Sequence, residues 1–333
     1  MQLINSLLVR GGKMKFKSLD RRKFIQGGSC LPILGFISNP EVVFASSLGL
    51  GQKSKYFQFF IGEIEIMVIS DGEFGLPMAT QAINAESRDE LDRFLLQYKM
   101  PLQEINRQTN HVVISTGANK ILIDVGSGHR FLPSVGKLHE NLESAGIEPD
   151  SITHVLLTHA HPDHVWGIRD DFDEVVFPNA QYFMGEKEYK WWMQDNLVNQ
   201  VEDQMQQIVL GAQNSLSALE EITLVGDNYE VLSSVNMIDL PGHTPGHMGV
   251  RVENSGKSVI ICGDALKNSF LDIKKPNWFD ANDMDGDMTV ITKKKILEEI
   301  FANQSLLLAY HFAFPGVGQI DKLGGSYEFS PLG

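Results

Sequence analysis

Short apolar runs recur along the chain, and they predict a set of buried strands. The clearest are residues 121–124, His154–Leu157, 235–240, 259–264 and Leu306–Leu308. Runs of this length, rich in Val, Ile and Leu, are typical of strands that are covered on both faces. Most of these runs are followed closely by a histidine or an aspartate, so polar side chains collect at the strand ends.

Segments with helical patterns lie between the predicted strands. Residues 87–98 and 293–302 are the clearest of these segments. The alternation of strands and helices favours an α/β fold over an all-β fold. The chain has 333 residues, of which 43% are hydrophobic, and this is enough for one large core. Because no linker or low-complexity block follows residue 55, we predict a single domain over residues 46–333.

The motif T-H-A-H-P-D-H carries the strongest chemical signal of the sequence, with four potential metal ligands. Residues i and i+2 of an extended segment point the same way, so His159 and His161 can bind one ion together. Pro162 fits the first turn of a helix, and from that turn Asp163 and His164 can reach a second ion. Imidazole and carboxylate ligands in this spacing indicate zinc, iron or manganese.

Three further ligands follow other predicted strands. His243 lies in the motif L-P-G-H-T-P-G-H, whose glycines and prolines predict a rigid turn. Asp264 ends an apolar run, where a carboxylate can bridge two cations. His311 precedes a Pro-Gly turn near the C-terminus. Active sites are often built at strand ends, so we expect these residues to join the first four in one site.

In this order the motifs resemble those of the metallo-β-lactamase superfamily, from about residue 55 to the C-terminus. The resemblance implies a four-layer αββα sandwich made of two similar halves, with the metals at one edge of two sheets. Residues 46–333 would then form a single metallo-β-lactamase-like catalytic domain.

The resemblance also implies a ligand set. One metal would be bound by His159, His161 and His243, the other by Asp163, His164 and His311, and Asp264 would bridge the two. Catalytic roles would fall to Asp163 and Asp264. We expect two divalent ions, with zinc favoured and manganese, iron or cobalt left open.

Three more polar residues near these motifs are candidates for supporting roles. Asp124 and His154 could form hydrogen bonds with the metal-binding imidazoles. The alternative, left open here, is that they make ordinary polar contacts within the fold. His247 could brace its loop without touching metal.

The ending Y-H-F-A-F-P-G at Tyr310–Gly316 resembles that of methyl parathion hydrolase and its relatives, which include N-acyl homoserine lactonases. Ala313 replaces a proline that is common there. The resemblance implies a hydrolase that uses a metal-bridging hydroxide to cleave a small ester-like substrate, namely a lactone, an aryl ester or a phosphotriester. A glyoxalase II-like thioesterase and a mononuclear iron persulfide dioxygenase remain alternatives.

By analogy with the family, five aromatic residues are expected to border the metal cleft, although packing in the core is an equal alternative. They are Trp191, Trp192, Phe270, Trp278 and Phe279.

Four aspartates follow closely in the sequence at positions 280, 283, 285 and 287. Their spacing does not fit a calcium-binding EF-hand loop, because Met284 and Ile291 occupy ligand positions. We expect a solvated loop in which Asp287 caps the following helix.

The N-terminal segment resembles a twin-arginine export signal. Arg21 and Arg22 precede the apolar pair Phe24-Ile25 and a modestly apolar stretch, and small residues near Ala45 offer a cleavage point. We therefore expect residues 1–45 to direct export through the twin-arginine export machinery and then to be cleaved off, and the enzyme to be periplasmic or secreted in a bacterium. A basic N-terminal tail is the alternative.

Charge and composition narrow the set of partners. The formal net charge is −14, and removal of seven basic and two acidic residues with segment 1–45 would bring it to −14 − 5 = −19. An acidic surface disfavours nucleic acid and anionic membranes, so a small-molecule substrate is expected. No apolar run is long enough for stable membrane insertion. Without residues 1–45 only Cys262 remains, so no internal disulfide is expected. A homodimer is left open.

Overall fold

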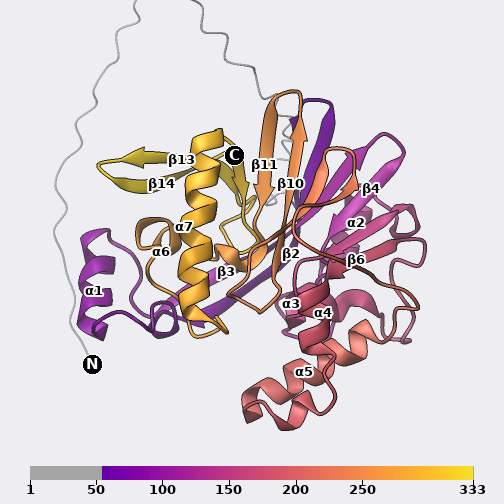
Figure 1. Cartoon of the computed structure of the whole chain (residues 1–333), viewed down its shortest axis with the longest axis horizontal. Helices are drawn as coiled ribbons and strands as arrows, with labels where there is room; N and C mark the ends of the chain where they lie inside the picture. Colours follow the sequence, from indigo (N-terminus) through magenta and orange to yellow (C-terminus); the bar gives the residue numbers. More distant parts are fainter. Residues whose placement is uncertain (1–54, 333) are drawn as a thin grey trace, which may run out of the picture. The chain divides into compact units, whose positions relative to one another are not determined.

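Two seven-stranded sheets form the centre of the structure, each built by one half of the chain (Figure 1). The structure is a computed structural model that describes residues 55–332. The first sheet contains, in spatial order, β1 (Tyr56–Ile61), β2 (Ile64–Pro77), β3 (Glu104–Thr116), β4 (Asn119–Ile123), β5 (His154–Leu157), β6 (Gln181–Gly185) and β7 (Thr223–Val225).

The second sheet runs through the chain in the reverse spatial order. It contains β14 (Ser326–Pro331), β13 (Val317–Leu323), β12 (Leu306–Leu308), β11 (Lys257–Ile261), β10 (Met248–Asn254), β9 (Val235–Asp239) and β8 (Tyr229–Leu232). Both sheets are mixed, because β4 to β7 pair in parallel in the first and β11 and β12 pair in parallel in the second.

The strands are buried on both faces, which explains their continuous apolar sequences. In β5, Leu156 packs into the layer between the sheets, whereas Val155 and Leu157 pack against helices on the outer face. β12 alternates in the same way, with Leu308 between the sheets and Leu307 under the helices of the other side. Each face of a strand therefore serves a different apolar layer.

Helices cover the outer face of each sheet. Side chains of α2, α3, α4 and α5 pack against the first sheet, and side chains of α6 and α7 pack against the second. The four-layer αββα prediction is therefore confirmed. The helices are α1 (Arg88–Gln97), α2 (Leu138–Ser144), α3 (Pro162–Val165), α4 (Glu186–Trp192), α5 (Asp203–Leu216), α6 (Leu271–Lys274) and α7 (Gly286–Asn303). Short 3-10 helices are η1 (Met78–Thr80), η2 (Pro149–Ser151), η3 (Trp166–Ile168), η4 (Leu197–Asn199) and η5 (Gly263–Ala265).

Helix α1 lies beside α6 (Figure 1). Ser87 caps α1 by accepting a hydrogen bond from the Glu90 backbone N–H, as is usual for serine at this position. Leu91 and Leu95 of α1 pack with Trp278 in a small apolar cluster.

The topology brings the predicted ligands to one edge. β9 and β11 are both antiparallel to β10, so they run in the same direction, and β12 runs parallel to β11. The carboxyl ends of these three strands, which precede His243, Asp264 and His311, therefore lie at the same edge of the second sheet.

Two expectations fall on residues that the structure does not describe. The export signal over residues 1–45 and its cleavage point lie outside the described range.

Within residues 55–332, no helix is both long and apolar enough to cross a membrane.

Candidate metal centre

Three imidazoles converge at the first candidate metal position. His159 Nε2 lies 3.0 Å from His161 Nδ1, which in turn lies 2.9 Å from His243 Nε2. His159 and His161 come from the loop after β5, and His243 comes from the loop between β9 and β10. Three ring nitrogens that face one another in this way match the ligand set of a zinc ion.

A second group lies beside the first and contains Asp163, His164 and His311. Pro162 is the first residue of α3, which turns Asp163 and His164 toward His311. His164 Nε2 and His311 Nε2 each lie 3.6 Å from Asp163 Oδ2. A carboxylate and two imidazoles are again a common set of ligands for a divalent transition metal.

Asp264 lies between the two groups. One carboxylate oxygen, Oδ2, lies 3.3 Å from His243 Nε2 and 3.0 Å from His311 Nε2. The other oxygen, Oδ1, lies 3.3 Å from His164 Nε2. The structure therefore brings together all seven ligands expected from the sequence.

The donor atoms of these side chains fit bound cations. Among the described residues, Asp163 Oδ2, His164 Nε2 and Asp264 Oδ1 are buried and have no hydrogen-bond partner. Buried polar atoms in folded proteins are nearly always paired, so orphaned ligand atoms in one place indicate a missing partner. A divalent cation would satisfy all three.

The two groups of candidate ligands differ in their electrostatic surroundings. Burial holds the pKa values of His159, His161 and His243 well below the usual value, so their imidazoles are neutral and available as ligands. Burial also lowers the pKa of His164, but Asp163, Asp124 and Asp264 more than offset this effect and leave the pKa well above the usual range. Burial alone would raise the pKa of Asp264, yet His311 and His164 hold it well below. The second group thus concentrates negative charge that a cation would neutralise.

The outer nitrogens of three ligand histidines face oxygen acceptors that fix the ring orientation. His164 Nδ1 lies 2.8 Å from Asp124 Oδ2, and His311 Nδ1 lies 2.8 Å from the Gln108 carbonyl oxygen. His243 Nδ1 lies 3.0 Å from Asp283 Oδ1. An N–H on the outer nitrogen leaves the inner nitrogen free for a metal, which is the usual arrangement at such sites.

Asp124 contacts a metal-binding imidazole, which was one of the two roles expected for it. It accepts hydrogen bonds from the Thr158 backbone N–H at 2.7 Å and from the Thr158 hydroxyl at 2.8 Å, in addition to its contact with His164. Its φ of 57° lies in the left-handed region, which is uncommon for a residue other than glycine. His154 does not reach the site: its ring contacts Thr153 and stacks on Phe183.

His247 braces two loops, as expected. Its Nδ1 lies 3.0 Å from the Leu240 carbonyl oxygen, and its Nε2 accepts a hydrogen bond of 3.0 Å from the Asp264 backbone N–H. Burial lowers the pKa of His247 to about 4. A neutral ring with its proton on Nδ1 therefore joins the loop of His243 to that of Asp264.

The expectation of a solvated aspartate loop is wrong for Asp280 and Asp283, whereas Asp285 and Asp287 are exposed. Asp280 is buried and pairs with Arg107 at 2.5 Å and with Lys267 at 3.0 Å, and Asp283 also pairs with Lys267. The helix cap is wrong as well, because Asp285 caps α7 by accepting from the Met288 backbone N–H. The loop bonds to the backbone of the His243 loop, and two of its four carboxylates contact the buried cationic side chains of Arg107 and Lys267. Sequence spacing alone carries no signal of these pairs.

A cleft of about 740 Å³ opens over the two ligand groups. Its apolar walls come mainly from β2, the loop after β4, α5 and the loop before α7, and include Phe74, Leu76, Phe131, Met205, Ile208 and Met284. The buried Arg107 also reaches this cleft.

The five aromatic residues expected at the cleft do not line it. Trp192 is fully buried and packs edge-on against His161, with Trp191 beside it. Phe270 and Trp278 pack with α1. Phe279 packs against Gly286 at the start of α7. Trp191 and Trp192 thus pack with the helices of the first sheet, and the other three rings pack with α1 or α7, which proximity in sequence to the motifs does not reveal.

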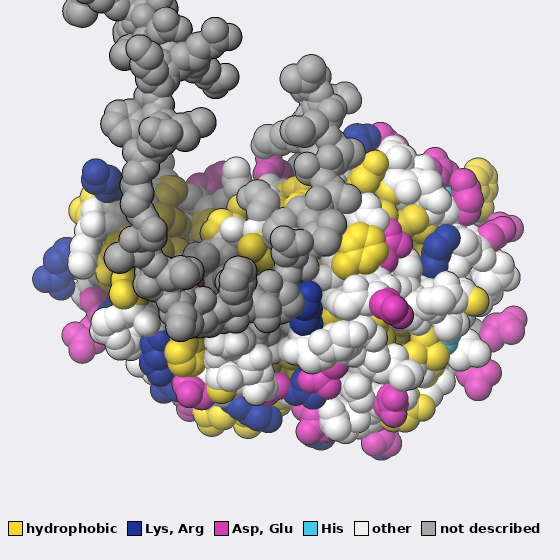
Figure 2. Space-filling model, turned by 90° about the horizontal axis from the view of Figure 1, so that it is seen from above, with side chains coloured by type: hydrophobic (Ala, Val, Ile, Leu, Met, Phe, Trp, Pro, Cys, Tyr) yellow, Lys and Arg dark blue, Asp and Glu magenta, His cyan; other side chains and the backbone are white. Residues whose placement is uncertain are grey.

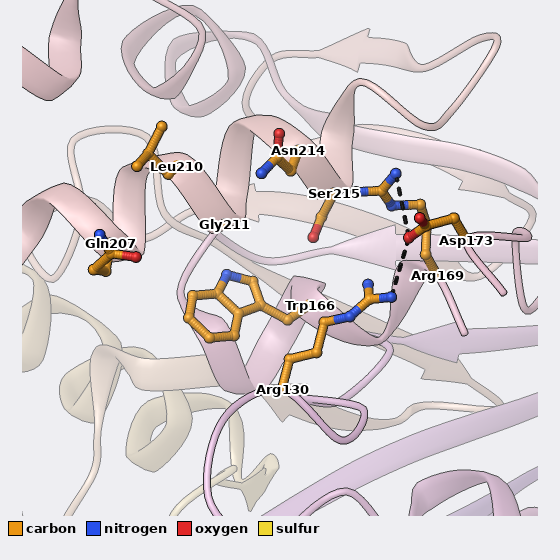
Figure 3. Close-up of a pocket in the computed structure, with 9 residues that line it drawn as sticks. All are labelled: Arg130, Trp166, Arg169, Asp173, Gln207, Leu210, Gly211, Asn214 and Ser215. Carbon is orange, nitrogen blue, oxygen red and sulfur yellow. Dashed lines mark hydrogen bonds and ion pairs between the residues drawn. The ribbon is translucent and has the colours of Figure 1, made fainter. Parts of the chain in front are cut away.

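A second cavity, of about 400 Å³, lies against α5 and contains none of the seven ligands (Figure 3). Arg130 and Arg169 both pair with Asp173 at its rim, and Trp166 lies against Gly211. The Phe131 and Trp166 rings contact each other edge-on. Phe131 belongs to the metal cleft and Trp166 to this cavity, so the two hollows are neighbours with different linings.

Comparison with known families agrees with this geometry. The sequence model of the metallo-beta-lactamase superfamily matches residues 105–295, which is more than half of the chain. The chain therefore belongs to the metallo-β-lactamase superfamily, and the family prediction is confirmed.

Sequence relatives share part of the chain. Uncharacterized protein YobT from Bacillus subtilis is 33% identical over 116 residues, which are 35% of this chain and 47% of YobT. N-acyl homoserine lactonase AiiA from Bacillus thuringiensis subsp. kurstaki is 28% identical over 135 residues, which are 39% of this chain and 46% of AiiA. The chain thus spans about half the length of these curated relatives.

Solved structures match over a larger part. AidC, described as a dizinc quorum-quenching lactonase in complex with a product, is 25% identical with a TM-score of 0.78, covering 84% of this chain and 98% of AidC. The hydrolase AbOPH is 25% identical with a TM-score of 0.76, covering 85% of this chain and 99% of AbOPH.

Proposed function

We propose that this protein is a metal-dependent hydrolase that cleaves a small ester-like substrate, with a lactone as the leading candidate. The position of Asp264 carries the proposal, because its two oxygens face both ligand groups at 3.0–3.3 Å. A carboxylate placed in this way suits a pair of cations that share one bridging ligand.

Two divalent ions are proposed, with zinc as the metal. Neutral imidazoles in the first group and the mixed carboxylate–imidazole second group both suit zinc. Ions bound there would lower the pKa of water and polarise a carbonyl or phosphoryl oxygen. AidC, which is described as a dizinc lactonase, supports this choice of metal.

The chain's own residues orient the reaction. Asp264 fixes the spacing of the two groups, and Asp124 and Asp283 hold His164 and His243 in the ligand orientation. Asp163 reaches the cleft from α3 and is the carboxylate placed to hold a proton for the departing oxygen.

The lining of the cleft supports an uncharged substrate with an apolar group. Phe74, Phe131 and Ile208 supply apolar surface beside the ligands. Such walls exclude water around the reacting bond and bind an acyl or aryl group. N-acyl homoserine lactones and phosphotriesters both combine these features. The relative AiiA, an N-acyl homoserine lactonase, supports testing lactones first.

The acidic surface supports a small molecule over nucleic acid. On the face drawn in Figure 2, acidic side chains are spread widely, with basic side chains among them. Together with the net charge of −14, this distribution disfavours a polyanionic substrate.

The second ligand group separates the leading proposal from one alternative. A mononuclear iron persulfide dioxygenase would need only the three histidines of the first group. Here Asp163, His164 and His311 form a complete second group with orphaned ligand atoms. This observation favours the dinuclear hydrolase. An assay that includes a thioester among the substrates distinguishes the hydrolase proposed here from the thioesterase alternative.

The test is a hydrolysis assay of the zinc-loaded protein against an N-acyl lactone, an aryl ester, a phosphotriester and a thioester. We expect the wild type to have its highest kcat/KM for the lactone. Asp264→Asn should lower this kcat/KM by at least about 100-fold. Asp287→Asn, an exposed aspartate on α7, is the matched control and should keep full activity. Preference for the thioester would favour the alternative. Undiminished turnover by Asp264→Asn would overturn the proposal.

A further inference from the structure

A buried carboxylate outside the ligand set joins both loops of the three-histidine group. Glu188 lies in α4 and is fully buried. One of its oxygens, Oε1, accepts hydrogen bonds from the Ala160 backbone N–H at 3.2 Å and from Trp192 Nε1 at 2.6 Å. The other, Oε2, accepts from the Thr244 hydroxyl at 2.7 Å and from the Gly246 backbone N–H at 2.8 Å.

These four donors surround the ligands of one metal position only. Ala160 stands between His159 and His161, and Thr244 directly follows His243. Trp192, which Glu188 holds by its indole N–H, packs edge-on against the His161 ring at 5.6 Å between centroids. All three histidines of the group are thus positioned through partners of one carboxylate.

The fit between the loop and α4 is close. A Cβ atom on Gly246 would lie 2.1 Å from the Glu188 backbone nitrogen, so only glycine lets the loop reach the carboxylate. Among the described residues, no Lys, Arg or His side chain forms an ion pair with Glu188, and the four donors that its oxygens accept from are neutral. Burying a carboxylate without a cation nearby is costly, so a role beyond filling space is expected.

We propose that Glu188 is a positioning residue that pre-organises the three-histidine group for its metal by tying the loop of His159 and His161 to the loop of His243. The inference rests on the proposed function, since it requires a metal in that group. Three neutral imidazoles bring no charge to a cation, and the carboxylate behind them supplies a negative charge that favours one.

Glu188→Gln tests this role with almost no change of volume. Each carboxylate oxygen accepts at least one N–H group, so the amide NH₂ faces another N–H in either orientation. One loop must therefore move away. The matched control is Glu186→Gln in the same helix, whose exposed side chain pairs with Lys190.

The measurement is a stepwise zinc titration of the full-length protein against a competing chelator. His161→Ala identifies the step of the three-histidine group, and His311→Ala identifies the step of the second group. We expect Glu188→Gln to weaken the first of these steps by about 10–100-fold and the other by less than about 3-fold. A cobalt-loaded sample should show a changed visible spectrum, which a purely structural role would not produce. Glu186→Gln should shift neither step.

The inference would be overturned if the wild type binds zinc in two steps and Glu188→Gln leaves both affinities unchanged or weakens both equally. The proposed function would then still stand. A wild type that binds no zinc at the three-histidine group would refute the proposed function itself. If Glu188→Gln does not fold, Thr244→Val decides, because it removes a single hydroxyl donor. It should weaken the same step several-fold, and an unchanged affinity would overturn the inference.

Discussion

At the scale of single residues, the site consists of seven ligands and of the buried polar residues that hold the ligand loops in place. Seven ligands stand in short motifs with distinctive spacing, and the structure brings all seven together. No sequence motif predicts the roles of Asp283 and Glu188. An aspartate in an acidic run and a glutamate in the segment G-E-K-E-Y both resemble surface residues. Only tertiary packing turns them toward Lys267 and toward the ligand loops.

His247 gives a residue-scale prediction about pH. Its pKa is lowered by burial to about 4, from about 6.5 in an unfolded chain. The neutral ring therefore contributes stability that is complete above pH 6.5 and is lost as the pH falls toward 4. In the metal-free protein, His247→Gln should reduce the slope of the unfolding free energy against pH by about 1.4 kcal/mol per unit across this window.

Urea unfolding at several pH values measures this slope. His139→Gln, which changes an exposed histidine of α2, is the control and should leave the slope as in the wild type. Equal slopes for the wild type and His247→Gln would contradict the assignment.

At the scale of elements, strands next to the site were predicted best. β5 and β12 have the predicted bounds, and β9 ends one residue earlier than expected. The described residues nevertheless contain far more strands than the five apolar runs, because strands such as β8 and β14 are partly exposed and mix polar with apolar residues. α7 begins at Gly286 rather than near residue 293, because its first turns carry Thr and Asp, which weaken the apolar pattern.

The turn before His243 gives an element-scale prediction. Gly242 has a φ of +129°, and a Cβ atom there would lie 2.4 Å from the Thr289 backbone nitrogen in α7. Gly242→Ala should therefore lower the free energy of unfolding by about 1–3 kcal/mol, from backbone strain and from the clash with α7. Chemical denaturation measures this change.

Gly226→Ala is the matched control for this turn, because a Cβ atom there meets nothing within 4 Å. It should change stability by less than about 0.5 kcal/mol. If Gly242→Ala is as stable as this control, the close approach of the loop to α7 is not a constraint.

At the scale of the whole molecule, the two halves of the chain each build one sheet, and both contribute ligands at one edge. The αββα architecture was predictable only through the family resemblance, because the halves do not repeat in sequence. The residues that line the cleft were not predictable. The five aromatic residues near the motifs pack with helices on the outer faces of the two sheets or with α1, while Phe74 and Phe131 line the cleft instead.

The most direct test of the account is the metal content of the purified protein after zinc loading and removal of excess metal. Because Asp264 joins two complete ligand groups, we predict about two zinc ions per chain, and about one in His311→Ala. Elemental analysis together with protein quantification gives this ratio. A wild-type ratio near zero or near one would contradict the paired metal centre.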